Sequence, residues 1–158
     1  MKRIYLDYNA STPLDPRVLK VLIKELEEEE GNPSSIHFHG QQCRRKLEEC
    51  RQAIARFFQV KPYEVIFTSG GTEGAALLLQ GILLQHPKGH VISSVVEHAC
   101  VYQTLKDFEK KGGEVSFLST GSWGAVRPEA VEKAILPHTR LITLMAVNNE
   151  TGVMTDIE

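Results

Sequence analysis

Three short segments of the sequence carry side chains that could bind or process a small charged ligand. Residues 68–74 read Thr-Ser-Gly-Gly-Thr-Glu-Gly, which combines two glycines with a hydroxyl where a helix is predicted to begin. Glycines let the backbone approach a ligand closely, and a helix start attracts anions through its free N–H groups and its dipole. Gly71 and Thr72 are therefore candidate phosphate or carboxylate binders. A tight turn capped by Thr72 is the alternative interpretation.

The other two segments offer an imidazole and two side-chain amides. His98 follows an apolar stretch and precedes a helical pattern, so it could stack on an aromatic ligand or move protons. Asn148 and Asn149 follow another apolar stretch, and amides there could recognise a phenolic or carboxylate oxygen. Taken singly, His98 could also be a helix cap, and the asparagines could be ordinary turn residues.

The elements that must position these residues alternate between strand and helix in the second part of the chain. Apolar runs predict strands, and periodic patterns predict helices between them; the strands are expected at 65–68, 90–95, 114–119 and 140–147, and the helices at 72–85, 98–111 and 128–136. This alternation predicts an α/β fold with a mostly parallel sheet and helices on both faces. Each candidate segment follows a strand, so all three are expected at the carboxyl edge of the sheet, where ligands bind in such folds.

The first part of the chain has a different pattern. Asp15 and Pro16 predict a helix start, with Val18, Leu19, Leu22, Ile23 and Leu26 on one face, and a second helix is expected at about 40–58. The run 27–30 of glutamates should close the first of these helices. We therefore divide the chain into an N-terminal loop and helical segment, 1–60, and the first part of an α/β domain, 61–158.

Composition narrows the classes of function. The 158 residues carry a formal net charge of -2 and are 42% hydrophobic, which is typical of a globular protein and argues against a nucleic-acid or anionic-membrane surface. No apolar run approaches the roughly 20 residues of a membrane span. Three cysteines, Cys43, Cys50 and Cys100, are an odd and sparse set, so a reducing cytoplasm is expected. We expect no metal site, and we interpret the cysteines as small buried or half-buried residues.

Five ordered motifs resemble one enzyme family. They are Tyr5–Pro13, Gly31–Ser35, Phe67–Glu73, the pair Glu97-His98, and Val147–Val153. Together they resemble the cysteine desulfurases of the class V aminotransferase superfamily, which are fold type I enzymes dependent on pyridoxal 5'-phosphate (PLP). The resemblance runs from Ile4 to the last residue and implies that the second part of the chain belongs to the large, PLP-binding domain.

The resemblance also implies roles for particular residues. Gly71 and Thr72 would bind the PLP phosphate, and His98 would stack on the ring and act catalytically by moving protons. Asn149 would contact the ring oxygen of PLP and the carboxylate of the substrate. In the family, L-cysteine is converted to L-alanine, and its sulfur passes to an enzyme cysteine and on to iron–sulfur scaffolds or other acceptors. Members are usually homodimers.

The sequence departs from the family pattern in two respects. Gly74-Ala75-Ala76 stand where the family usually has Ser or Ala and Asn. The family's Schiff-base lysine, the acidic partner of the ring nitrogen and the persulfide cysteine lie further downstream, and no lysine here has the Ser-x-His-Lys context. We therefore expect a fragment that binds PLP weakly and is inactive alone. The alternatives are another class V enzyme, such as a selenocysteine lyase, kynureninase or aminotransferase, and a non-catalytic binding or dimerisation piece.

Overall fold

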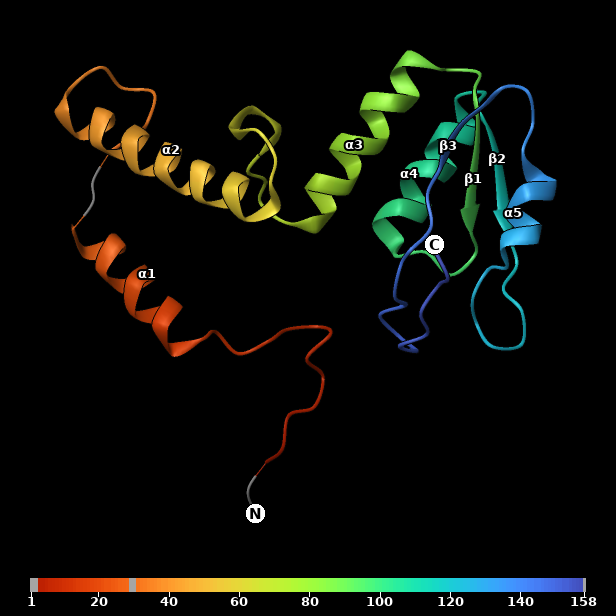
Figure 1. Ribbon diagram of the computed structural model, residues 1–158, viewed down its shortest axis with the longest axis horizontal. Helices are drawn as coiled ribbons and strands as arrows, with labels where there is room; N and C mark the ends of the chain where they lie inside the picture. The colour runs from red at the N-terminus through yellow and green to blue at the C-terminus, as the bar shows by residue number, and fades with distance from the viewer. Residues whose placement is uncertain (1–2, 29–30, 158) are drawn as a thin grey trace. The chain divides into compact units, whose positions relative to one another are not determined.

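The computed structural model describes residues 3–28 and 31–157 (Figure 1). In chain order the elements are α1 (Pro16–Glu28), α2 (Phe38–Phe58), the short 3-10 helix η1 (Pro62–Glu64), α3 (Gly71–Gln85), β1 (His90–Ser94), α4 (Ala99–Lys110), β2 (Glu114–Leu118), α5 (Pro128–Ala134) and β3 (Thr139–Ile142). They form two compact units, Met1–Phe67 and Thr68–Glu158. The functional division at residue 60 stays a prediction.

The first unit consists of helices whose ends follow the sequence closely. The Asp15 carboxylate accepts a hydrogen bond from the Arg17 backbone N–H at 2.8 Å, which caps α1 as predicted. The His37 imidazole accepts one from the Gly40 N–H at the start of α2. The expected end of α1 in the glutamate run is reached at Glu28, and residues 29–30 lie outside the described part of the chain. The apolar side chains along α1 are largely exposed.

The strand predicted at 65–68 is wrong, because the structure has no strand there. The Val65 carbonyl accepts a hydrogen bond from the Arg51 guanidinium, which also lies over the Phe67 ring at 5.0 Å. Ile66 is 67% exposed. A β-prone sequence forms a strand only where a neighbouring strand accepts its backbone hydrogen bonds, and within the described residues none does so here.

The second unit is built on a three-stranded sheet of order β2-β1-β3, with both pairs parallel. The connection from β1 to β2 runs through α4, and the return from β2 past β1 to β3 runs through α5. Because such crossovers are right-handed, the reversal of direction places the two helices on opposite faces of the sheet. Figure 1 shows α3 and α4 on one side and α5 on the other. The predicted α/β class, parallel sheet and covering helices are confirmed.

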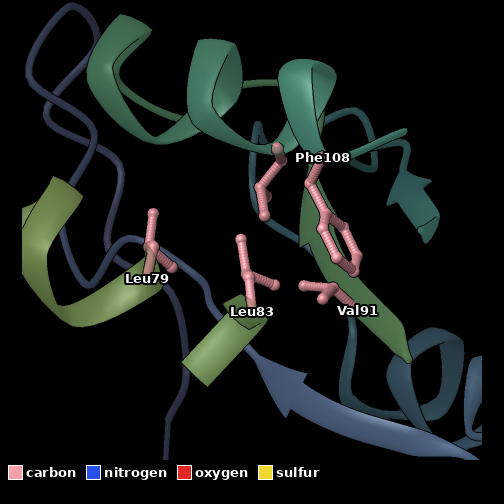
Figure 2. Packing of buried hydrophobic residues seen from close by; sticks show 5 residues of the cluster. Leu79, Leu83, Val91 and Phe108 are labelled. Carbon is pink, nitrogen blue, oxygen red and sulfur yellow. The ribbon is translucent and has the colours of Figure 1, made fainter. Parts of the chain in front are cut away.

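A small hydrophobic core fixes α3 and α4 to the central strand. Leu79 and Leu83 of α3, Leu105 and Phe108 of α4, and Val91 of β1 are all at most 7% exposed and belong to one cluster. Figure 2 shows Leu83 of α3 and Phe108 of α4 pointing toward Val91. Full burial of such a side chain is worth about 1.5–3 kcal/mol. This packing holds the second half of α3 to α4 and to the central strand.

The last strand is shorter than predicted. β3 ends at Ile142, which pairs with Ile92 of β1, rather than at Val147. Beyond Ile142 the chain folds back on itself: the Asn148 N–H donates to the Val153 carbonyl, and Val147 and Met154 form an antiparallel bridge. The apolar residues after β3 therefore form a local turn structure at the carboxyl end of the sheet.

Candidate functional site

The glycine-rich segment forms the start of α3. Gly70 precedes the helix, and Gly71 is its first residue. The first N–H groups of a helix have no partner within the helix, so those of Gly71 and Thr72 are available to an anion. The Glu73 carboxylate turns back to the Ser69 hydroxyl at 2.6 Å and to the Ser69 N–H at 2.7 Å. These hydrogen bonds, the hydroxyl's first, hold the pKa of Glu73 below its usual value.

The backbone at the start of α3 leaves room for a small ligand. A Cβ built on Gly70 or on Gly71 would meet nothing within 4 Å apart from its chain neighbours. The space in front of this backbone is therefore open, and Thr72 is exposed beside it. At Gly74 a Cβ would lie 3.6 Å from the Thr68 hydroxyl oxygen, which is an ordinary contact. The departure from the family pattern at residue 74 therefore leaves the shape of the turn intact.

His98 is exposed and lies immediately before α4. Its Nδ1 accepts a hydrogen bond from the Cys100 N–H at 3.2 Å and lies 3.0 Å from the Cys100 sulfur. The imidazole is thus a helix cap, as one of the two interpretations predicts. Because Nδ1 accepts from the backbone, Nε2 carries the proton in the neutral ring and points away from the cap.

The two asparagines after β3 differ sharply. Asn149 is exposed, and its amide donates to the Glu150 carboxylate at 3.1 Å. Asn148 is buried at 7% exposure, and its Oδ1 accepts hydrogen bonds from the Glu150 N–H at 3.0 Å and the Thr151 N–H at 2.9 Å. The pair thus consists of an internal anchor of the turn and an outward amide.

Glu97 is a residue whose position the sequence alone does not reveal. Its Oε1 accepts from the Ser94 hydroxyl at 2.8 Å and from the Met145 N–H at 2.9 Å. The Asn148 amide donates to the Val96 carbonyl at 3.1 Å. These bonds join the segment after β1 to the segment after β3. In the sequence, the feature that could have pointed to Glu97 and Asn148 is that each directly precedes a candidate site residue, His98 or Asn149.

The three cysteines differ in how far they are buried. Cys43 and Cys100 are half-buried as expected, but Cys50 is exposed, so that part of the expectation is wrong. Cys50 lies in α2, whose unit buries few side chains. Over the described ranges 3–28 and 31–157, no three His, Cys, Asp or Glu side chains gather to hold a metal. None of the helices there is both long and apolar enough to cross a bilayer.

Comparison with known proteins gives the chain a family. The aminotransferase class-V family matches residues 4–158. The cysteine desulfurase IscS of Dictyoglomus turgidum is 42% identical over 161 residues, which cover 100% of this chain and 41% of that protein. The mitochondrial cysteine desulfurase of Saccharomyces cerevisiae is 39% identical over 158 residues, covering 98% of this chain and 32% of that protein.

Solved structures agree with these sequence relatives. A NifS-like protein superposes with a TM-score of 0.92 at 35% identity, covering 98% of this chain and 43% of that one. SspA in complex with cysteine superposes with a TM-score of 0.90 at 35% identity, covering 98% of this chain and 45% of that one. The chain thus spans about two fifths of the length of the first relatives that it matches.

Proposed function

The chain belongs to the aminotransferase class-V family, and from this premise we propose that it forms the cofactor-binding edge of a PLP-dependent cysteine desulfurase. One observation carries the proposal: the start of α4 and the segment after β3 lie at the carboxyl end of the sheet, and α3, which packs on α4, begins toward the same end (Figure 1). Gly71 with Thr72, His98 and Asn149 stand in these segments. Ligands of open α/β sheets bind at this end.

Each residue has a distinct part in this proposal. The N–H groups of Gly71 and Thr72, with the Thr72 hydroxyl, hold the phosphate of PLP. The His98 ring stacks on the pyridine ring and holds or releases a proton at Nε2. The Asn149 amide donates to the ring oxygen of PLP and orients the carboxylate of L-cysteine. Bound PLP supplies an electron sink that no amino-acid side chain offers.

The proposal also covers the substrate and the reaction of the whole enzyme, of which this chain would be a part. SspA, a structural neighbour, is in complex with cysteine, which supports L-cysteine as the substrate. The IscS and mitochondrial cysteine desulfurase relatives support desulfuration rather than another class V reaction. A homodimer, an iron–sulfur scaffold or other sulfur acceptor, and a cytoplasmic location stay predictions from the resemblance. We expect no alanine release when this chain alone is incubated with PLP and L-cysteine.

Binding to the chain alone should be weak. Hydrogen bonds to charged groups contribute about 1.5–3 kcal/mol each. A micromolar dissociation constant needs about 8 kcal/mol after the costs of association. The groups of Gly71, Thr72 and His98 should therefore give a dissociation constant nearer to the millimolar range.

A titration with 4'-deoxypyridoxine 5'-phosphate tests the proposal. This probe keeps the ring and phosphate of PLP but has no aldehyde, so it does not react with surface lysines. Thr72→Val should weaken binding about tenfold or more, because a charge-assisted hydrogen bond is lost. The matched control is Thr104→Val, which removes a hydroxyl bonded to the Cys100 carbonyl within α4 and should leave binding unchanged. Absence of binding to the unmodified chain, or equal losses in both variants, would contradict the proposal.

A further inference from the structure

Two polar side chains join the segments that follow β1 and β3. Glu97 Oε1 accepts from the Ser94 hydroxyl at 2.8 Å, within its own segment, and from the Met145 N–H at 2.9 Å, in the other. Asn148 Nδ2 donates to the Val96 carbonyl at 3.1 Å in the reverse direction. The two segments are therefore linked twice, once from each side. We call Glu97 and Asn148 the latch.

Both polar atoms of the Asn148 side chain have hydrogen-bond partners. Its Oδ1 accepts from the Glu150 N–H, the Thr151 N–H and the Thr151 hydroxyl, and its Nδ2 also lies 3.2 Å from the Met145 sulfur. A buried amide with all of its polar atoms engaged is costly to disturb, because each group left unpaired loses its hydration without compensation. The turn after β3 is consequently tied to the segment after β1.

Each latch residue directly precedes a residue of the proposed site. Glu97 is half-buried and His98 exposed; Asn148 is buried and Asn149 exposed. In both segments an inward side chain is fixed and its neighbour faces outward. Fixing the inward member fixes the backbone from which the outward member projects.

We propose that the latch sets the relative placement of His98 and Asn149, so that Glu97 and Asn148 are positioning residues for one ligand shared by two loops. This inference rests on the proposed function. A ring held between an imidazole and an amide needs both groups at a fixed separation, because errors in placement of about 1 Å weaken the productive geometry strongly. The pairing of β1 with β3 reaches Ile92 and Ile142, and the latch adds hydrogen bonds between the two loops beyond that pairing.

Binding of 4'-deoxypyridoxine 5'-phosphate to latch variants tests this role. Glu97→Ala removes the acceptor for Met145, and we expect a loss of affinity of about tenfold. Glu97→Gln keeps an oxygen that can accept both hydrogen bonds, so affinity should return to within about threefold of the unmodified chain. Asn148→Asp keeps the Oδ1 acceptor but loses the donor to Val96, and we expect a loss similar to that of Glu97→Ala.

A matched control separates positioning from general destabilisation. Ser116→Ala removes a hydrogen bond to His90 on the sheet, away from the latch. It should lower the midpoint of urea unfolding without changing affinity for the probe. If Ser116→Ala weakens binding as much as the latch variants do, the positioning role is overturned.

Two readouts on the free chain keep this test independent of ligand binding. The Met145 amide should exchange its hydrogen at least tenfold faster in Glu97→Ala, and the ring nitrogen NMR signals of His98 should shift in both Glu97→Ala and Asn148→Asp. If the unmodified chain does not bind the probe, the proposed function fails while these readouts still judge the latch. Unchanged His98 signals in both variants would overturn the latch even if the probe binds.

Discussion

The two ends of the three-stranded sheet use polar side chains in opposite ways. At the amino end, His90 is completely buried, with Nδ1 2.8 Å from the Thr139 hydroxyl and Nε2 2.9 Å from the Ser116 hydroxyl. Both ring nitrogens therefore form hydrogen bonds with side chains of the neighbouring strands. At the carboxyl end, half-buried Glu97 precedes exposed His98, and buried Asn148 precedes exposed Asn149.

This difference separates stability from binding. Side chains at the amino end satisfy one another and leave nothing for a ligand. At the carboxyl end, Glu97 accepts from the Met145 N–H and Asn148 donates to the Val96 carbonyl, while His98 and Asn149 are exposed. Both ends thus carry structural hydrogen bonds, and the carboxyl end, where ligands of open α/β sheets bind, also has the exposed side chains of His98 and Asn149.

Replacement of His90 should have the largest effect on stability. His90→Ala leaves a cavity in the central strand and two hydroxyls without their partner, so we expect a loss of about 2–4 kcal/mol in the free energy of unfolding. His138→Ala is the control at the same end. His138 is exposed and pairs with Glu114 at 2.8 Å, so its loss should cost less than about 1 kcal/mol. Equal losses of unfolding free energy in the two variants would contradict the distinction between the buried hydrogen bonds of His90 and the exposed pair of His138 with Glu114. Urea unfolding measures both.

The second prediction concerns pH. Burial, partly offset by the Glu114 charge and reinforced by His138, lowers the pKa of His90. The unfolded chain therefore binds a proton at His90 at a higher pH than the folded chain does. Stability should be complete above the unfolded pKa of about 6.5 and should fall as the pH decreases below it, by at most about 1.4 kcal/mol per pH unit for this one group.

The matched measurement is the unfolding free energy of His90→Gln between pH 5 and 7. Its dependence on pH should be shallower than that of the unmodified chain, whereas His138→Gln should keep most of the slope. An identical slope in His90→Gln would show that the buried imidazole does not govern acid sensitivity.

Adjacent serines of β1 give the smallest and most local contrast. Ser94 donates to Glu97, so Ser94→Ala should cost about 1 kcal/mol. Ser93 is also buried, but its hydroxyl has no partner in the part of the chain that the structure describes. Ser93→Ala should therefore leave stability unchanged or raise it by up to about 1 kcal/mol. Thermal unfolding of the two variants side by side checks the opposite signs.

The local sequence pattern predicted correctly those helices and strands that pack against a neighbouring element in the described part of the chain. The starts of α1 and α3 and the parallel strands β1, β2 and β3 followed from caps, glycines and apolar runs. The strand expected at 65–68 and the second half of the strand expected at 140–147 did not form, because strand formation depends on a neighbour that local sequence does not specify. The candidate site residues were predicted from strand ends and the family resemblance and stay predictions; for Gly71 and Thr72 the expected preceding strand is absent. The latch did not, since which of two adjacent polar residues turns inward depends on tertiary contacts.

The central claim is that the carboxyl end of the sheet, and not the amino end, binds the phosphate and ring of PLP. NMR mapping of backbone amide, side-chain amide and histidine ring signals during titration with 4'-deoxypyridoxine 5'-phosphate tests this assignment. We expect the largest shifts on the Gly71 and Thr72 amides, the His98 ring and the Asn149 side chain, while the signals of His90, Ser116 and Thr139 stay unchanged. Shifts centred on the His90 network, or none at millimolar probe, would contradict it.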